Sequence, residues 1–178
     1  MSTLTADPGF ARGQTLGVTV TMYEAENGDG STVVGTRKVF RDEDPKTGAL
    51  KSNHTVECIA VKNTSGSALL PGAVAKFKDA AILTEVDGAA TTSTLLMGIV
   101  DEYLPAAGVA NNEVFWLVVG GPSTVTKTST SVSAGAAYGL SATAGSAAAK
   151  STNPLLGYAI ETSATTSGRI LVKTDAGS

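Results

Sequence analysis

His54 and Cys58 are the only histidine and the only cysteine of the chain, and they lie four residues apart. A thiolate beside an imidazole would be a nucleophile with its base. Residues 55–62 are rich in β-branched side chains, however, and predict a strand. Positions four apart along a strand share a face but are separated by about 13 Å, beyond hydrogen-bond reach. The spacing therefore predicts a histidine in a turn and a buried cysteine, and no catalytic pair.

Other nucleophile and metal-site patterns are also missing from the sequence. Serine is plentiful, but no Gly-x-Ser-x-Gly motif is followed by a histidine, because His54 lies early in the chain. A Ser-His triad is therefore not expected. A single cysteine and a single histidine exclude a Cys/His zinc cage and an intrachain disulfide. The sequence predicts a protein that is not an enzyme and needs no cofactor.

Acidic residues gather in three places. Residues 24–30 resemble part of a calcium loop, but Ala25 and Thr36 stand at its first and twelfth positions, where carboxylates are required. Residues 42–44 are acidic and precede a proline, which predicts a solvated turn. The pair Asp101-Glu102 lies on a predicted strand, where neighbours point to opposite faces, so it is no acid–base pair. No metal site is predicted.

The aromatic residues provide the one alternative binding chemistry, since exposed aromatic platforms bind sugars. Phe115 and Trp116 are neighbours with opposite orientations on a predicted strand, and Tyr103, Tyr138 and Tyr158 lie near the edges of predicted units. We expect these rings to lie in the core or in an interface, where aromatic residues bury large apolar areas. A glycan- or receptor-binding β-module stays open as the alternative.

Composition and charge exclude several classes of protein. The 178 residues carry a formal net charge of −3 and 16% charged residues, and this length suits one domain or two small ones. No basic patch exceeds Arg37-Lys38 with Arg41, too little to neutralise the phosphates of a nucleic acid. No apolar run reaches the roughly 18 residues that span a bilayer, and the first residues lack the pattern of a signal peptide. We expect no membrane, no nucleic acid, and synthesis in a cytoplasm.

The elements that would position these residues begin with an irregular segment. Residues 1–16 show neither helical nor strand periodicity and predict an extended N-terminal arm. Residues 17–23 alternate apolar and polar side chains, as a strand does. Turn-forming residues follow at 26–30, and the chain then resumes with β-branched residues. A hairpin is therefore predicted over 17–41.

The rest of the chain repeats itself. The first copy comprises 70–77, 96–102 and 113–119, and the second comprises 133–140, 155–161 and 169–174. The spacing within each copy is too short for a parallel crossover with a helix, but it suits antiparallel strands and turns. The Ala-rich run 144–150 is too short to be stable as an isolated helix. The sequence predicts a mainly β fold of two small tandem antiparallel β-sandwich or barrel-like units.

The repeated blocks also carry a resemblance. Residues 69–74, 97–100 and 113–118, echoed by 156–161 and 168–172, resemble segments of small head-decoration (cement) proteins of tailed bacteriophages. The resemblance covers roughly residues 56–175. It implies a non-enzymatic, β-rich structural protein of the virion that binds the outer surface of an expanded icosahedral capsid. There it bridges neighbouring major capsid subunits and stabilises the shell against internal DNA pressure. The resemblance carries over no active-site residues.

These observations predict three parts: an N-terminal arm and hairpin (1–50), a first β-unit (51–121) and a second β-unit (122–178). Cores built from alanine and valine gain less on burial than leucine and phenylalanine cores, so we expect a partner surface to contribute. The resemblance implies that this partner is the major capsid protein. We also expect a homo-oligomer, with a trimer as the first expectation and a dimer as the second. The protein is expected on the outer capsid surface of the virion, after synthesis in the host cytoplasm.

The predicted arm is the expected point of contact with the capsid. An extended segment can add a strand to the edge of a neighbouring sheet, where backbone hydrogen bonds give affinity. The large side chains of the arm are the candidate capsid contacts: Leu4, Phe10, Arg12 and Leu16.

Overall fold

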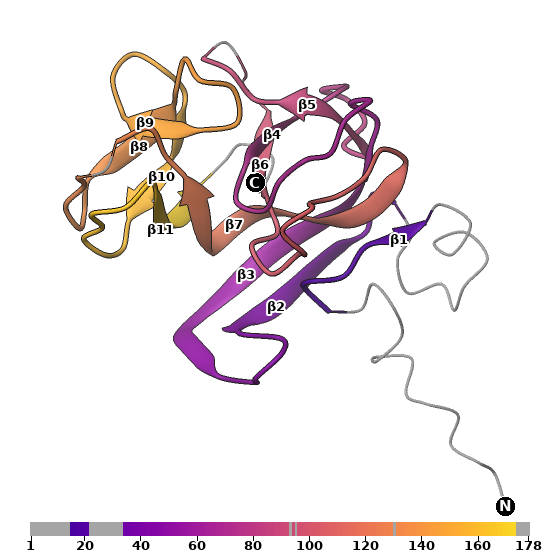
Figure 1. Cartoon of the computed structure of the whole chain (residues 1–178), viewed down its shortest axis with the longest axis horizontal. Helices are drawn as coiled ribbons and strands as arrows, with labels where there is room; N and C mark the ends of the chain where they lie inside the picture. The colour runs from indigo at the N-terminus through magenta and orange to yellow at the C-terminus, as the bar shows by residue number, and fades with distance from the viewer. Residues whose placement is uncertain (1–14, 22–33, 93, 95, 130, 174–178) are drawn as a thin grey trace, which may run out of the picture.

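The computed structural model describes residues 15–21, 34–92, 94, 96–129 and 131–173 (Figure 1). These residues form strands and turns and contain no helix, which confirms the mainly β prediction. Within the Ala-rich run, Ala147–Ala149 forms a strand. The strands are β1 (Val20–Thr21), β2 (Arg37–Glu43), β3 (Leu50–Asn63), β4 (Val74–Phe77), β5 (Glu85–Ala89), β6 (Met97–Val100), β7 (Glu113–Thr126), β8 (Ala137–Leu140), β9 (Ala147–Ala149), β10 (Leu155–Ala159) and β11 (Ser167–Lys173).

Five strands close into a ring, which we call the first ring. The hydrogen-bonded order is β3-β5-β4-β6-β7, and β7 pairs in turn with β3. The β3–β5 pair is parallel, and the other pairs are antiparallel. The alternate side chains of these strands fill one hydrophobic core, which includes Ile59, Phe115 and Leu117. The ring has no open edge within itself, because every one of its strands has two neighbours.

Four further strands join β7 in a second ring. Its order is β7-β11-β10-β8-β9, and an isolated parallel bridge from Ala147 of β9 to Lys127 returns to the chain just after β7. Tyr138, Leu140 and Ile170 lie in its core, within a hydrophobic cluster that also holds Trp116 of β7. Phe115 and Trp116 therefore point to opposite sides of β7, as the alternation predicts, one into each core.

β7 belongs to both rings, and it changes direction where it leaves the first. Gly121 has a φ of +83°, and a Cβ at this position would lie 2.0 Å from the carbonyl oxygen of Thr55 on β3. Only glycine combines that backbone conformation with so close an approach. The predicted boundary between 121 and 122 thus lies inside one continuous strand. The division of the chain into two separate units stays a prediction.

Corresponding hydrogen bonds recur in the two rings. Before β4, Gly72 has a φ of +74°, and its N–H donates to the carbonyl oxygen of Val100 at 2.9 Å. Before β8, Gly135 has a φ of +80°, and its N–H donates to the carbonyl oxygen of Ala159 at 2.8 Å. The strand order β5-β4-β6-β7 is likewise mirrored by β9-β8-β10-β11. The echoed sequence blocks therefore occupy corresponding places in the hydrogen-bond network.

The N-terminal region differs from its prediction. In the described residues β1 pairs with β7, and β2 pairs with β3, so these strands do not form the predicted hairpin over 17–41. The hairpin that does form joins β2 to β3 through a turn at residues 44–49, where the side chain of Asp44 accepts the N–H of Lys46 at 2.8 Å. The predicted partner of β2, the segment 17–23, is wrong. The alternation of β2 fits either that segment or β3, and only the tertiary fold decides between them.

Candidate functional site

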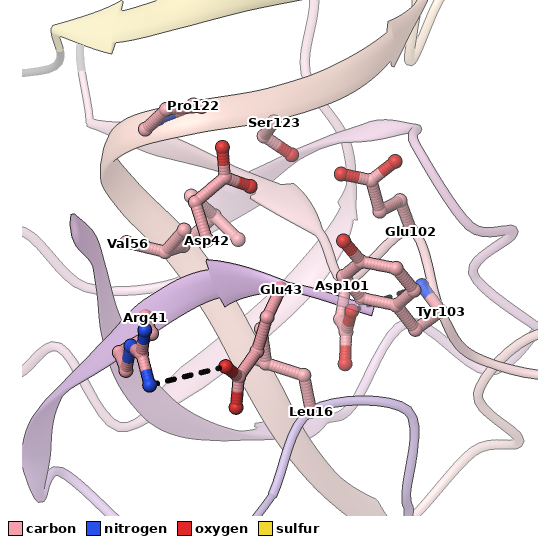
Figure 2. A pocket seen from close by; sticks show the side chains of 11 residues that line it. Leu16, Arg41, Asp42, Glu43, Val56, Asp101, Glu102, Tyr103, Pro122 and Ser123 are labelled. Carbon is pink, nitrogen blue, oxygen red and sulfur yellow. Dashed lines mark hydrogen bonds and ion pairs between the residues drawn. The ribbon is translucent and has the colours of Figure 1, made fainter. Parts of the chain in front are cut away.

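A cluster of charged side chains gathers where the β2–β3 hairpin meets both rings (Figure 2). Asp42 comes from β2, and Asp101 and Glu102 come from the turn after β6. Lys51 of β3 and Arg169 of β11 supply positive charge. We call these five residues the charged cluster.

Asp42 and Arg169 form its buried ion pair. The carboxylate of Asp42 is only 2% exposed and accepts a hydrogen bond from the guanidinium of Arg169 at 2.6 Å. Its second oxygen accepts the hydroxyl of Ser52 at 2.5 Å. A buried carboxylate requires such partners, because burial of an unpaired charge is strongly unfavourable. The prediction of a solvated turn is thus wrong for Asp42, whose pairing ties the β2–β3 hairpin to the second ring.

The carboxylate of Asp101 binds the backbone at Gly17, just before β1. One carboxylate oxygen accepts the N–H of Gly17 at 2.5 Å, and the other accepts the N–H of Tyr103 at 3.0 Å. Burial raises the pKa of Asp101 to about 6, and the nearby charge of Glu102 adds to this, although the two backbone hydrogen bonds act in the opposite direction. The carboxyl group therefore fastens the segment before β1 to the end of β6.

Glu102 and Asp101 both line the cavity, and their carboxylates are directed away from each other (Figure 2). β6 ends at Val100, so both acids lie in the following turn, where the alternation of a strand no longer applies. The carboxylate of Glu102 accepts the hydroxyl of Thr124, and Lys51 Nζ lies 3.6 Å from it. The same Nζ lies 4.5 Å from the ring centroid of Tyr103, a cation–π contact. The predicted placement of Asp101 and Glu102 on a strand is therefore wrong, whereas their carboxylates engage different partners and form no pair.

The cavity among these residues is small. Its volume is about 10 Å³, near the minimum that holds one water molecule. Ser123 Oγ lines it, is buried, and has no hydrogen-bond partner within the described residues. The carboxylates of the cluster are engaged by backbone N–H groups, hydroxyls and cations of the chain itself. The arrangement is suited to holding three parts of the fold together, and it leaves no room for an organic substrate.

His54 and Cys58 lie on the same strand but in different environments. His54 lies exposed on β3 and not in a turn, so that part of the prediction was wrong. Cys58 is buried on the same strand, and burial raises the pKa of its thiol well above the usual value. A buried, protonated thiol is a poor nucleophile.

The candidate capsid contacts fall on both sides of the boundary of the described structure. Leu4, Phe10 and Arg12 lie outside the described residues, as do residues 24–30 of the incomplete calcium loop. Leu16 is described and is only 6% exposed, in the core cluster that also holds Val56. Its side chain therefore contributes to the protein's own core, because burial of a large apolar side chain is favourable.

The large aromatic rings mostly lie inside the protein. Trp116 is 0% exposed and meets Phe40 edge to face at a centroid distance of 5.2 Å. Phe115 and Tyr138 are also buried, whereas Tyr158 is exposed. The expectation of core aromatic residues is confirmed for the three buried rings. The described part of the chain holds no group of three or more metal-ligating side chains, and none of its segments is a helix that could cross a membrane.

Sequence reasoning missed the charged cluster. Asp42 and Arg169 are separated by 127 positions, and neither lies in a motif that indicates the other. The one available signal was the position of Asp42 within an alternating stretch that places its side chain on the same side as Phe40.

The chain matches no model of a known protein family, and no curated protein matches it significantly. The function is therefore inferred from the fold and the surfaces of this chain.

Proposed function

We propose that the protein is a capsid decoration protein, which binds the outer surface of an icosahedral phage capsid and bridges neighbouring major capsid subunits. It acts as a homo-oligomer on the outside of the virion. We favour a trimer over a dimer. The role is structural and involves no chemical step and no cofactor.

The observation that carries this proposal is the firm anchoring of the chain at Leu16 and Gly17. Leu16 is buried in the core, the N–H of Gly17 donates to Asp101, and β1 pairs with β7 immediately afterwards. A segment that precedes such an anchor can transmit force from a partner to the folded body. The 14 residues before Thr15 span at most about 50 Å when extended, enough to reach a neighbouring subunit.

The rest of the molecule supports the same role. Two fused rings with buried cores give a body that resists deformation, and its surface carries many small side chains that let flat β surfaces approach closely. Binding of many copies to a repetitive shell stabilises that shell by mass action, so modest affinity per copy suffices. The charged cluster contributes by joining the β2–β3 hairpin, the first ring and the second ring.

The experiment mixes purified protein with expanded phage heads that lack it and pellets the heads. We expect the protein to co-sediment and to saturate at a fixed number of copies per head. Heads that already carry the protein serve as the matched control, because their sites are filled. Protein that stays in the supernatant with the empty-site heads would contradict the proposal.

The alternative, a glycan- or receptor-binding module of a tail or fibre, requires an exposed aromatic platform. The buried Trp116 offers none, and a Trp116→Ala variant would unfold the core rather than test a sugar site. A glycan array probed with the intact protein tests this alternative directly. Specific glycan binding without head binding would favour it over capsid decoration.

A further inference from the structure

The second ring carries an apolar row on its outer face. Ala137 of β8 pairs with Tyr158 of β10, which pairs in turn with Leu171 of β11. The residues next to them along these strands are buried in the core, so the three side chains point outward. Tyr158 is 42% exposed, and Ile160 just beyond β10 is exposed as well. We call Ala137, Tyr158 and Leu171 the outer row.

The first ring has the corresponding row in the same register, but there it is covered. Val74 of β4 pairs with Ile99 of β6, which pairs with Val118 of β7. Their exposed fractions are 0%, 0% and 2%. The two rows therefore differ in what lies over them.

A turn of the second ring supplies part of the cover on the first. The turn between β8 and β9 lies against the end of the buried row, where the carbonyl oxygen of Gly145 accepts the N–H of Val74 at 2.9 Å. The N–H of Gly145 donates to the carbonyl oxygen of Ala90, also at 2.9 Å. Within the chain, the β8–β9 turn of one ring thus meets the end of the row of the ring before it through backbone hydrogen bonds.

The first ring has the equivalent turn, between β4 and β5. The N–H of Lys78 donates to the carbonyl oxygen of Glu85, just as the N–H of Ser141 donates to that of Ser146 across the β8–β9 turn. The β4–β5 turn carries Ile82, which is 57% exposed beside a surface hollow of about 410 Å³. Among the described residues, this turn covers no row.

The molecule therefore displays both halves of a contact that it makes once within itself. We propose that the β4–β5 turn of a second copy, led by Ile82, docks on the outer row of the first. The proposal deepens the homo-oligomer of the proposed function, on which it rests, and does not depend on capsid binding.

Charge is complementary across this contact. The exposed Asp79 lies on the β4–β5 turn. Lys150 flanks the outer row, because its N–H donates to the carbonyl oxygen of Ala137, and Lys173 lies two residues beyond Leu171 on the same face of β11. Lys78 and Glu85 of the turn pair with each other at 2.6 Å, which leaves Asp79 as its remaining charge. Around the outer row the two lysines outnumber the exposed Glu161, so unlike surfaces pair more favourably than like ones.

The contact is heterologous, since each copy offers its turn to one neighbour and its row to another. Repetition of such a contact closes into a ring when the rotation between copies allows it, as in a trimer, and otherwise forms a filament.

The experiment measures association by analytical ultracentrifugation over a dilution series, without capsids. Tyr158→Glu and Ile82→Glu should each raise the dissociation constant by about tenfold or more, because each places a charge in an apolar contact. Leu70→Glu is the matched control, because Leu70 is 56% exposed but lies on neither surface. Its association should equal that of the wild type. Thermal unfolding of every variant checks that the fold is intact.

Mixing the two variants gives the decisive readout. The Tyr158→Glu protein keeps an intact turn and the Ile82→Glu protein keeps an intact row, so the mixture should form a one-to-one heterodimer that neither forms alone. A wild type that stays monomeric throughout the dilution series would overturn the inference, and so would a mixture that fails to form the heterodimer. Head binding by a monomeric wild type would leave capsid decoration standing while this contact fails.

Discussion

Asp101 holds its carboxylate inside the protein and fastens Gly17 with it. Its pKa of about 6 lies above the 3.8 of an unburied aspartate, so the unfolded chain releases this proton at lower pH than the folded one. The contribution of Asp101 to stability is therefore complete below about pH 4 and is lost as the pH rises to about 6. A shift of two units corresponds to about 3 kcal/mol in the free energy of unfolding.

We predict that Asp101→Asn removes this pH dependence. Urea unfolding of both proteins at several values between about pH 4 and pH 7 gives the difference in their free energies of unfolding. The wild type should lose its advantage over the variant by about 3 kcal/mol across that range, because only the wild type must bury a charge. The other carboxylates are common to both proteins and cancel. Parallel curves for the two proteins would show that Asp101 titrates normally.

The sequence predicted the partners of individual side chains least well. The burial of Cys58 and Trp116 followed from residue type and alternation, which are local properties. The pairing of Asp42 with Arg169 depends on how the hairpin lies over the second ring, and the placement of Asp101 and Glu102 beside one cavity depends on where β6 ends. Both are consequences of tertiary structure, which periodicity does not encode.

Among the elements, β7 has the most demanding geometry, because it runs through both rings. Gly121 sits at its change of direction with a positive φ, and the carbonyl oxygen of Thr55 occupies the place where a side chain would begin. Gly66 also has a positive φ, of +78°, but a Cβ there would meet nothing within 4 Å. A side chain at Gly66 would therefore meet only the backbone strain of a positive φ, whereas a side chain at Gly121 would meet both that strain and a steric clash with β3.

We predict that Gly121→Ala destabilises the protein far more than Gly66→Ala. The control should lose about 1 kcal/mol, the conformational penalty alone. Gly121→Ala must also displace β3 from β7, which raises the loss above about 3 kcal/mol or prevents folding. Thermal and urea unfolding of the two variants measure the difference. Equal losses would mean that β3 and β7 do not meet closely at this point.

The strands themselves were largely predictable, because alternation and turn residues are local signals. The blocks that became β4, β6, β7, β8, β10 and β11 were located from the repeat. The pairing partners were harder: β2 fits either neighbour by pattern, and the closure of the first ring through β3 and β7 joins segments about 60 residues apart. Local patterns specify a strand, but long-range packing selects its neighbour.

For the whole molecule, the proposed function assigns different roles to the residues before and after Thr15: the earlier residues bind the capsid, and Leu16 and Gly17 stabilise the fold. Deletion of 1–14 removes none of the contacts described above, whereas deletion of 1–17 also removes the buried Leu16 and the hydrogen bond from Gly17 to Asp101. If the first 14 residues bind the capsid and the next residues hold the fold, the two deletions must differ in kind. Deletion of 1–14 should lower capsid binding alone, whereas deletion of 1–17 should lower both capsid binding and stability.

We predict that the protein without residues 1–14 keeps the melting temperature of the full chain to within about 2 °C but no longer co-sediments with expanded heads. The protein without residues 1–17 should also melt lower, because loss of a buried leucine costs about 2–5 kcal/mol. Differential scanning calorimetry and head pelleting on the same samples give both readouts. Full head binding by the shorter deletion would place the capsid contact on the folded body, whereas equal melting of the two deletions would show that Leu16 and Gly17 do not anchor the chain.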